Sequence, residues 1–416
     1  MSNSASEIST SSKPQKNIHP IVFTFLILPM GVMNGFVNVT LAYLYTKAGL
    51  PVEQVAALIA AGLSPHIFKF LWAPLVDSTL SAKKWYIIAN TISAIGMLAM
   101  GILPVNSGNI VLLSSIVMFS NVAVTLVAMS TESVMAYDVP EEKKGRAGGY
   151  FQAGNLGGGG VGGGVGLWLA QRMPEAWMSS GIIAGACFLC VLGLFFVNDV
   201  KSNVRSENLI TSFNNVFKDI WLILKSQSGL LVVILCFLPM GTGAASNLWA
   251  AVADDWNASA DTVALVTGVF GGFVMAAGCL LGGWICDRMN RKTAYWVFGL
   301  CGALTATGMA FSPKTESMYI IWTSVYAIMS GLSYAGFTAV VLEAIGKGAA
   351  ATKYNIFAAL SNTPIYYMIY INGQAHTKWG ASGMLNTESF FGLIGVLFFI
   401  VLQFFMLRRK PALVTA

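Results

Sequence analysis

Four ionisable residues stand inside long apolar runs of this chain. Lys69 follows His66 by three residues, and Glu132 and Glu343 lie late in two other runs. If such runs cross a bilayer, a charge near the middle costs about 2.5–3.5 kcal/mol on insertion scales, so it should face water, a counter-charge or a ligand. A lysine and a histidine three residues apart share one face of a helix and can hold an anion. A carboxyl group in apolar surroundings can exchange a proton, because burial disfavours its charged form.

Other interpretations of these residues remain open. Lys69 can extend toward the membrane surface and keep its charge in water. Glu343 can pair with Lys347, one helical turn further on. Glu132 has no basic residue within a turn, which makes it the better candidate for proton exchange. A pair between Lys69 and Glu132 is compatible with the sequence but does not follow from it.

The composition indicates which elements must position these residues. Of 416 residues, 56% are hydrophobic and 10% are charged, and the mean hydropathy is +0.68. Soluble domains carry about 25% charged residues. Twelve apolar runs of about 20 residues or more are long enough to cross a bilayer: 20–46, 52–76, 84–104, 109–137, 147–171, 177–198, 229–253, 261–286, 293–312, 317–345, 353–375 and 387–407. We therefore predict an all-α membrane protein with twelve transmembrane helices.

The basic residues are distributed unevenly between the predicted loops. With the N-terminal tail taken as inside, the outer loops hold only a few of the 24 Lys and Arg residues, namely Lys47, Arg172, Lys314 and Lys378. Lys69 lies within a span, and all the others fall on the inner side. The positive-inside rule therefore predicts a multi-pass protein with both termini in the cytoplasm.

An internal repeat divides the chain in two. The motif LPMG occurs at Leu28–Gly31 and again at Leu238–Gly241, and the same offset relates Asp77 to Asp287 at the ends of the second and eighth spans. Repeated six-helix units are common in transporters. The predicted segments are a cytoplasmic tail at 1–19, a six-helix bundle at 20–198, a cytoplasmic linker at 199–228, a second bundle at 229–408 and a tail at 409–416.

The linker has a helical pattern of apolar residues beside basic ones. This pattern suits a short amphipathic helix on the inner membrane surface, although a loosely ordered linker fits the sequence equally well. The residues of the pattern are Phe213, Phe217, Trp221 and Leu224, next to Lys218 and Lys225.

The loop after the eighth span carries a recognisable motif. Residues 283–292 read GWICDRMNRK, which resembles the G-x-L-x-D-R-x-G-R-R signature of the major facilitator superfamily and departs from it at Asn290. An acid at a helix end beside basic residues can form an ion-pair latch that biases a two-state carrier. Plain positive-inside topology is the alternative. The predicted latch residues are Asp77, Asp287, Arg288 and Arg291.

Residues 60–170 resemble one branch of that superfamily, the peptide–acetyl-CoA transporters. FKFLWAPLVD at 68–77 is similar to the second-helix motif of the branch. The stretch from STE at 130–132 through EEKKGRAG at 141–148 to LWLA at 167–170 is similar to its fourth and fifth helices, with Ala136 where the branch has a second acid. The branch includes muropeptide permeases and shorter siderophore permeases. The resemblance implies two pseudo-symmetric six-helix bundles, alternating access, and a place in the bacterial inner membrane.

The same resemblance implies which polar residues line a central cavity. In this superfamily spans one, four, seven and ten line it, and spans three, six, nine and twelve are plainer supports. Any single polar residue can instead bond two helices together. The expected substrate-binding residues are Asn34, Asn38, His66, Lys69, Asn121, Gln152, Asn155, Asn247, Trp249, Tyr326, Tyr334, Asn362, Tyr366 and Tyr370. The expected proton-coupling residues are Glu132 and Glu343.

A glycine run in the fifth span needs a separate explanation. GNLGGGGVGGGVG at 154–166 satisfies a dinucleotide-binding fingerprint, but no strand precedes it, so we interpret it as helix-packing glycine. Glycine every four residues lets helices approach closely, and in this superfamily helices five and eight meet between the bundles. The predicted bundle-interface glycines are Gly158, Gly162 and Gly166, with Gly271 and Gly278 in the eighth span.

These observations predict a secondary transporter that imports a muropeptide-like or siderophore-like anion with protons. An exporter of the same fold is the alternative, although the helix-five G-x-x-x-G-P motif of exporters lacks its proline here. An intramembrane enzyme is the second alternative. The histidines at 19, 66 and 376 form no H-E-x-x-H, and no G-x-S-x-G occurs. Cys187 and Cys190, a C-x-x-C in an apolar run, fit helix packing. We expect no cofactor, metal or nucleic acid, and a monomer in the lipid bilayer.

Overall fold

The computed structural model describes residues 18–139, 141–198, 209–225, 227–345 and 356–408. Every regular element within these ranges is a helix. The predicted tails lie outside the described residues, apart from residues 18 and 19.

The first half of the chain crosses the molecule six times. Short π or 3₁₀ segments (labelled η) interrupt several crossings without ending them. The crossings are α1 (Val22–Gly35), η1 (Phe36–Leu41) and α2 (Ala42–Lys47); α3 (Val52–Phe68), η2 (Lys69–Leu71) and α4 (Ala73–Ser78); α5 (Ala82–Ile102); α6 (Ile110–Asp138); α7 (Glu141–Gly160), η4 (Val161–Val165) and α8 (Gly166–Arg172); and α9 (Ala176–Leu189) with η5 (Cys190–Phe196).

The second half repeats this arrangement after a separate helix, α10 (Leu209–Lys225). Its crossings are α11 (Gln227–Leu235), η7 (Ala244–Leu248) and η8 (Ala253–Trp256); α12 (Ala260–Val263), η9 (Ala264–Phe270) and α13 (Gly271–Cys286); α14 (Arg291–Phe311); α15 (Glu316–Ile345); and α17 (Asn362–Arg408), whose two crossings turn at Gly380, with φ of 67°.

Twelve crossings can be traced through the described residues, as predicted. Nine segments there are continuous and apolar enough to span a membrane on their own. The last of them contains two crossings, since Ile356–Phe404 runs through the turn at Gly380. The remaining two are the glycine-rich fifth crossing and the broken seventh.

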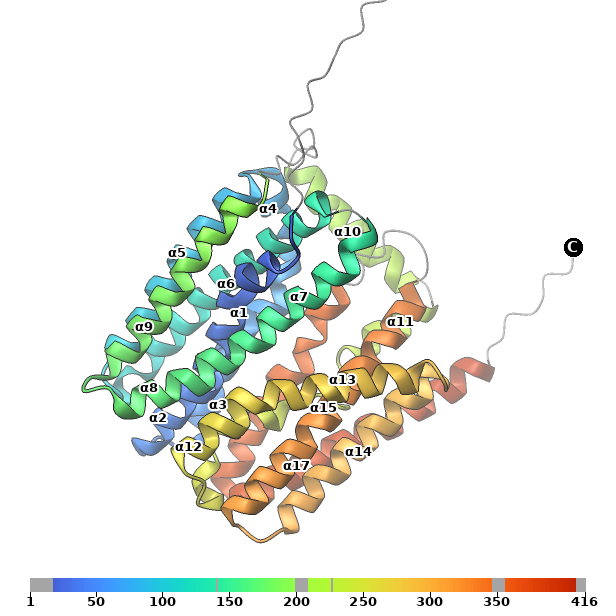
Figure 1. Cartoon of the computed structure of the whole chain (residues 1–416). Helices are drawn as coiled ribbons and strands as arrows, with labels where there is room; N and C mark the ends of the chain where they lie inside the picture. The colour runs from blue at the N-terminus through green and yellow to red at the C-terminus, as the bar shows by residue number, and fades with distance from the viewer. Residues whose placement is uncertain (1–17, 140, 199–208, 226, 346–355, 409–416) are drawn as a thin grey trace, which may run out of the picture.

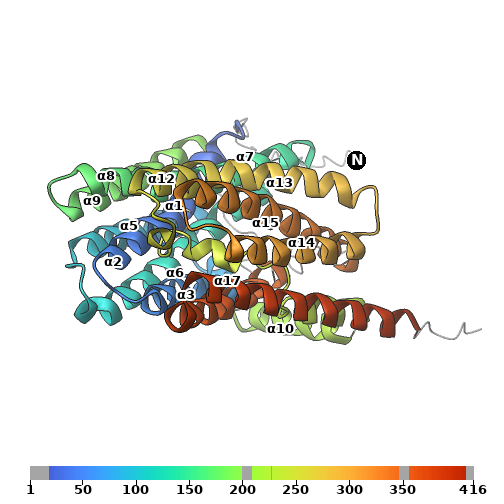
Figure 2. The same cartoon turned by 90° about the horizontal axis from the view of Figure 1, so that it is seen from below.

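The two halves lie side by side, the first drawn blue to green and the second yellow to red (Figure 1). Seen from below, the long helices run roughly along one direction (Figure 2). α1 packs on α7, and α5 packs between α6 and α9; in the second half α13 packs on α15, and α14 between α15 and α17. The halves meet where α3 lies against α17 and η4 against η9. We call the end with the first residues of α1 and the last of α17 the terminal end, and the other the far end.

The seventh crossing is broken where the sequence predicted a continuous span at 229–253. α11 ends at Leu235, and regular structure resumes only at Ala244. Gly241 and Gly243 have φ of 62° and 66°, which side chains with a Cβ rarely adopt. The carbonyls of Phe237 and Met240, freed by the break, accept hydrogen bonds from the hydroxyls of Tyr367 (2.8 Å) and Tyr295 (3.2 Å). Irregular backbone at membrane depth is stable when such partners replace the helical ones.

The predicted assignment of the interface glycines was wrong for Gly158, Gly162, Gly166 and Gly278. A methyl group on Gly158 or Gly162 would overlap the backbone of α1, and one on Gly166 would approach Thr40, so these three pack within the first half. Gly278 packs on Ile328 of α15, within the second half, whereas Gly271 lines a cavity between the halves together with Asn155 and Gly160. Glycines that contact the other half include Gly160, Gly164, Gly268, Gly272 and Gly373: a methyl on Gly164 would lie 2.7 Å from Ala264 O of η9. In the glycine-rich crossing, residues 158, 162 and 166 form one series with a four-residue repeat, and residues 160 and 164 form another. The rotation of the helix about its axis decides which series faces the first half and which faces the second.

The linker helix is present as α10, so the amphipathic alternative is correct for residues 209–225. Phe217 and Trp221 are exposed, and Lys225 Nζ lies 5.2 Å from the Trp221 ring centroid. α10 contacts α4 of the first half and α11 of the second. An exposed aromatic face beside lysines suits the surface of a membrane.

Candidate functional site

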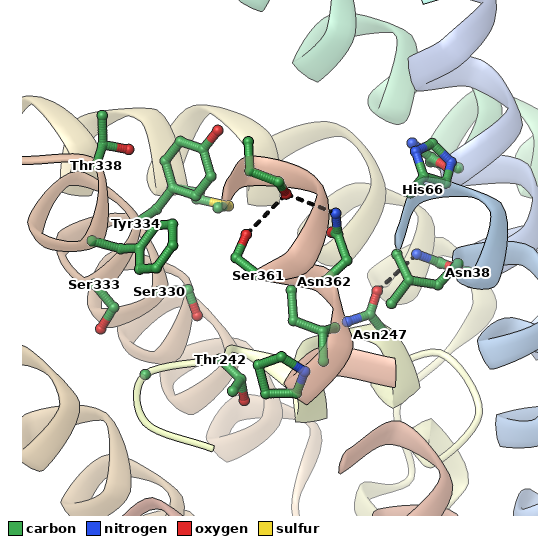
Figure 3. Close-up of a pocket in the computed structure, with 18 of the residues that line it drawn as sticks. Asn38, His66, Thr242, Asn247, Ser330, Ser333, Tyr334, Thr338, Ser361 and Asn362 are labelled. Atoms are coloured by element: carbon green, nitrogen blue, oxygen red, sulfur yellow. Dashed lines mark hydrogen bonds between the residues drawn. The ribbon is translucent and has the colours of Figure 1, made fainter. Parts of the chain in front are cut away.

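A cavity of about 370 Å³ lies between the two halves. Residues of both halves line it, as Figure 3 shows for Asn38 and His66 on one side and for the α15 residues Ser330, Ser333 and Thr338 on the other. It contains nine of the fourteen predicted substrate-binding residues: Asn34, Asn38, His66, Lys69, Asn121, Asn155, Asn247, Tyr334 and Asn362.

Two side-chain contacts organise the first-half wall. Asn38 Nδ2 donates to Asn247 Oδ1 at 2.9 Å, a bond that joins the two halves (Figure 3). His66, 5% exposed, places Nε2 3.4 Å from Asn121 Oδ1. The amide of Asn121 is itself fixed, because its Nδ2 donates to the carbonyl of Val117 at 2.9 Å. The walls therefore present amides and an imidazole held in defined orientations.

Lys69 is the one charged side chain among the described residues lining this cavity. It begins η2, directly after α3 ends at Phe68. Pro65, one turn earlier, lacks a backbone N–H, and Pro74 starts the next helical segment, so the helix is weakened on both sides of Lys69. Lys69 acts electrostatically on His66 and on Glu132 of α6, but forms no direct ion pair with Glu132. Glu132 is half-buried and lies outside the cavity lining.

Five predicted lining residues lie elsewhere. Trp249 and Tyr326 are buried and pack edge to face, with ring centroids 5.2 Å apart. Gln152 is exposed on α7. Tyr366 and Tyr370 are 38% and 50% exposed. Each step of four residues rotates a helix by about 40°, so these tyrosines turn away from the side of α17 where Asn362 and Ile365 face the cavity.

Several lining residues escaped the sequence interpretation, among them Thr242, Ser333 and Ser361. Thr242 lies in the break of the seventh crossing, which no local pattern predicted. Ser333 falls off the four-residue spacing that links Tyr326, Ser330 and Tyr334. Its buried hydroxyl has no hydrogen-bond partner in the described structure, nor has that of Thr338. Unsatisfied hydroxyls at a cavity wall are available to a ligand or to water.

The largest omission is Glu388. It lies in the twelfth predicted span, which we expected to be a plain support, and that expectation was wrong for this residue. Glu388 is 7% exposed and accepts hydrogen bonds from Tyr326 and Asn372 at 2.8 and 2.6 Å. An acid inside an apolar run was the available signal, and its position near the start of the span made it look like a surface residue.

At the terminal end, the latch side chains that the structure describes, those of Asp287, Arg288 and Arg291, form no ion pair with the described residues of the first half. Glu343 pairs with Arg291 at 3.9 Å and with Lys292 at 3.7 Å, all within the second half, and its side chain is 42% exposed. An exposed, paired carboxylate suits a structural ion pair better than a buried proton carrier. Asp287 and Arg288 are exposed, and Arg288 stacks 4.0 Å from the Trp284 ring. The side chain of Asp77 lies outside the described residues.

At the far end, ion pairs do join the halves. Lys47 Nζ lies 2.6 Å from Asp254 Oδ1. Arg172 makes two hydrogen bonds to Asp261, at 3.2 and 3.3 Å. Together with the Asn38–Asn247 bond, these pairs join the two halves on the far side of the molecule.

Twelve crossings in two six-helix halves around a polar cavity define a membrane transporter. Residues 22–365 match the Major Facilitator Superfamily, and the chain belongs to this family. It is a multi-pass membrane protein and a transporter rather than an enzyme.

Known proteins resemble this chain at low sequence identity. It is 21% identical to the anhydromuropeptide permease of Escherichia coli (strain K12) over 354 residues, which is 80% of this chain and 68% of the permease. A POT family transporter solved in complex with 5-aminolevulinic acid superposes with a TM-score of 0.72 at 12% identity, covering 95% of this chain and 99% of that one. A D-xylose-proton symporter superposes with a TM-score of 0.70 at 16% identity, covering 92% of this chain and 96% of that one. These structures share the fold.

Proposed function

We propose that the chain is a proton-coupled importer of an anionic organic solute in the bacterial inner membrane, with both termini in the cytoplasm. One observation carries this proposal: among the described lining residues of the cavity, a single cation, Lys69, stands in a wall of amides and hydroxyls. Lys69 is half-buried, and a cation withdrawn from bulk water without an ion-pair partner favours a ligand that brings the opposite charge.

The rest of the lining suits a cargo rich in hydroxyl and amide groups. Side-chain amides both donate and accept hydrogen bonds, and they recur at Asn34, Asn155 and Asn362. The volume lies within the range of about 300–1,000 Å³ common for small-molecule sites. A muropeptide-like compound, with sugar hydroxyls, peptide amides and carboxylates, matches this chemistry, and the relative at 21% identity is named a permease for anhydromuropeptides. A siderophore-like anion matches it as well.

Glu132 is the candidate for coupling to protons in the first half. Lys69 is the cation that acts on it. When an anionic cargo occupies Lys69, Glu132 loses part of the charge that favours its ionised form, and uptake of a proton becomes easier. Cargo and proton would then bind together, as symport requires.

The direction of access follows from the closed far end. With Lys47–Asp254 and Arg172–Asp261 in place, the cavity faces the terminal end, the cytoplasmic side in this proposal. Import would require these pairs to open and Arg291, Lys292 and Glu343 to approach the first half.

Uptake into proteoliposomes tests the proposal. Labelled anhydromuropeptide, a ferric siderophore and acetyl-CoA would be offered under an inward proton gradient, with and without a protonophore. We expect one anionic compound to accumulate, the protonophore to prevent it, and Lys69→Ala to abolish it. Lys84→Ala, at an exposed lysine outside the cavity, is the matched control. Accumulation that ignores the protonophore would rule out proton coupling, and outward movement alone would favour an exporter.

A further inference from the structure

Glu388 is a buried acid surrounded by hydrogen-bond donors. Its Oε1 accepts from the Tyr326 hydroxyl at 2.8 Å and, more weakly, from Thr242 Oγ1 at 3.4 Å. Its Oε2 accepts from Asn372 Nδ2 at 2.6 Å. One carboxylate therefore ties together the seventh, tenth, eleventh and twelfth crossings.

This carboxylate has no cation beside it in the described structure. Its direct titratable neighbour is Tyr326 of α15, and Tyr367 of the eleventh crossing also acts on it electrostatically. The break of the seventh crossing contributes only the hydroxyl of Thr242. On the α14 side, Gly299, Gly302 and Ala303 complete the surroundings without an ionisable group. Buried acids are usually neutralised by a paired cation, so here a proton is the species that can balance the charge.

A small cavity lined by Glu388 lies next to the main one. Its volume of about 20 Å³ is enough for one water molecule, which needs roughly 10–15 Å³. Glu388 lines it together with Gly241, Thr242, Ser330 and Ser333, and these last four also line the main cavity. The unpartnered hydroxyl of Ser333 lies at this boundary. A single water placed there could pass a proton between the main cavity and the carboxylate.

We propose that Glu388 binds a proton and that this step controls closure of the far end through the broken seventh crossing. The inference rests on the proposed proton-coupled transport and assigns it a site in the second half.

The mechanical link runs along the seventh crossing. A carboxyl group that takes a proton from water becomes a donor, and the hydroxyl of Thr242 or Tyr326 can rotate to accept from it. Rotation of the Thr242 hydroxyl removes its bond to Glu388, and the same oxygen accepts from the N–H of Ala244 at 3.3 Å, so the break of the seventh crossing responds. Thr242 lies five residues before Asn247, which bonds to Asn38 of the first half, and Trp249 packs on Tyr326. Protonation therefore weakens the segment that holds the halves together.

Infrared difference spectroscopy of the reconstituted protein tests this without any cargo. A protonated carboxyl has a carbonyl band that its ionised form lacks. Titration from about pH 5 to about pH 9, the range reached by buried glutamates, should show a band that Glu388→Gln removes and Glu132→Gln retains. Tyr326→Phe removes a donor to the ionised form, so the band should persist to higher pH. This shift separates a proton site from a purely structural carboxylate.

The outcomes separate this inference from the proposed function. A titrating band assigned to Glu388 supports the inference even if uptake proves insensitive to a protonophore, which would defeat only the proposed coupling. Proton-driven uptake with no band that depends on Glu388 overturns the inference and leaves the proposed function standing. If Glu388→Gln does not fold, the wild-type titration and the Tyr326→Phe shift still decide the question.

Discussion

The sequence Leu-Pro-Met-Gly occurs at equivalent places in the first and seventh crossings, yet it folds differently in each. Leu28–Gly31 lies inside α1, which continues past Pro29. Leu238–Gly241 follows the end of α11, and the chain stays irregular until Ala244. The difference shows that this motif does not determine its own conformation.

Packing and the following residues explain the two outcomes. Gly31 lies so close to α7 that a methyl group would overlap the carbonyl of Asn155, and this contact holds α1 in place. After Gly241 come Thr242 and Gly243, where a second positive φ and a bond from Ala244 N to Thr242 Oγ1 (3.3 Å) favour a turn. One half thus has a rigid support where the other has a hinge beside the cavity.

The largest effect expected from this comparison is on Gly31. Gly31→Leu would force α1 and α7 apart. The loss in the free energy of unfolding should exceed the about 1–3 kcal/mol of ordinary overpacking. Thermal unfolding should show a large loss of stability and little folded protein. Gly157→Ala, where a methyl meets nothing within 4 Å, is the control on α7, the helix that Gly31 contacts. A stable Gly31→Leu protein would contradict the rigid-support interpretation.

The next effect concerns movement between the halves. Gly164→Leu would press on Ala264 and Val269 of the second half while leaving the first half intact. We expect transport to stop and thermal stability to change little. Gly162→Leu should instead destabilise the protein, because it faces Val32 of α1. If both variants behave alike, the assignment of the two glycine series is wrong.

A smaller effect is expected at the hinge. Gly241→Ala places a Cβ where φ is 62°, at a cost of roughly 1–2 kcal/mol for a left-handed residue. The new methyl would also approach Ser333 Oγ to 2.7 Å. Stability should fall modestly and transport more strongly. Gly185→Ala, where a methyl also has open space and which lines none of the described cavities, should leave both unchanged.

The smallest effect belongs to the far-end ion pairs. Lys47→Ala removes the pair with Asp254, and exposed pairs contribute about 0.2–1 kcal/mol. Distances between spin labels at Glu175 and Thr377, one on each half, should shift modestly toward the open state. Lys378→Ala, an exposed lysine at the same end, should leave them unchanged. An equal response to both variants would mean that the Lys47 pair does not bias the conformation.

The sequence predicts the parts of this molecule that depend on local pattern. Apolar length and charge gave twelve crossings, and the major facilitator fold is confirmed. Polar residues in spans one, two, four, seven, ten and eleven predicted much of the cavity, including Lys69 and Asn247. What failed depended on tertiary structure: the rotation of helix five chose which glycines face which half, and burial of Glu388 required four crossings to converge. The break after Leu235 also followed from context, since the Leu-Pro-Met-Gly motif within it is helical in the first crossing.

The account assigns anion binding to Lys69 of the first half and proton binding to Glu388 of the second. Comparing exchange with accumulation tests this division most directly. Proteoliposomes with the wild type, Lys69→Ala or Glu388→Gln would be given labelled anhydromuropeptide, or whichever anion of the uptake panel accumulates. Exchange would be measured without a gradient and accumulation with a proton gradient. We predict that Lys69→Ala loses both, whereas Glu388→Gln keeps exchange and loses accumulation. Normal exchange by Lys69→Ala, or gradient-driven accumulation by Glu388→Gln, would contradict the account.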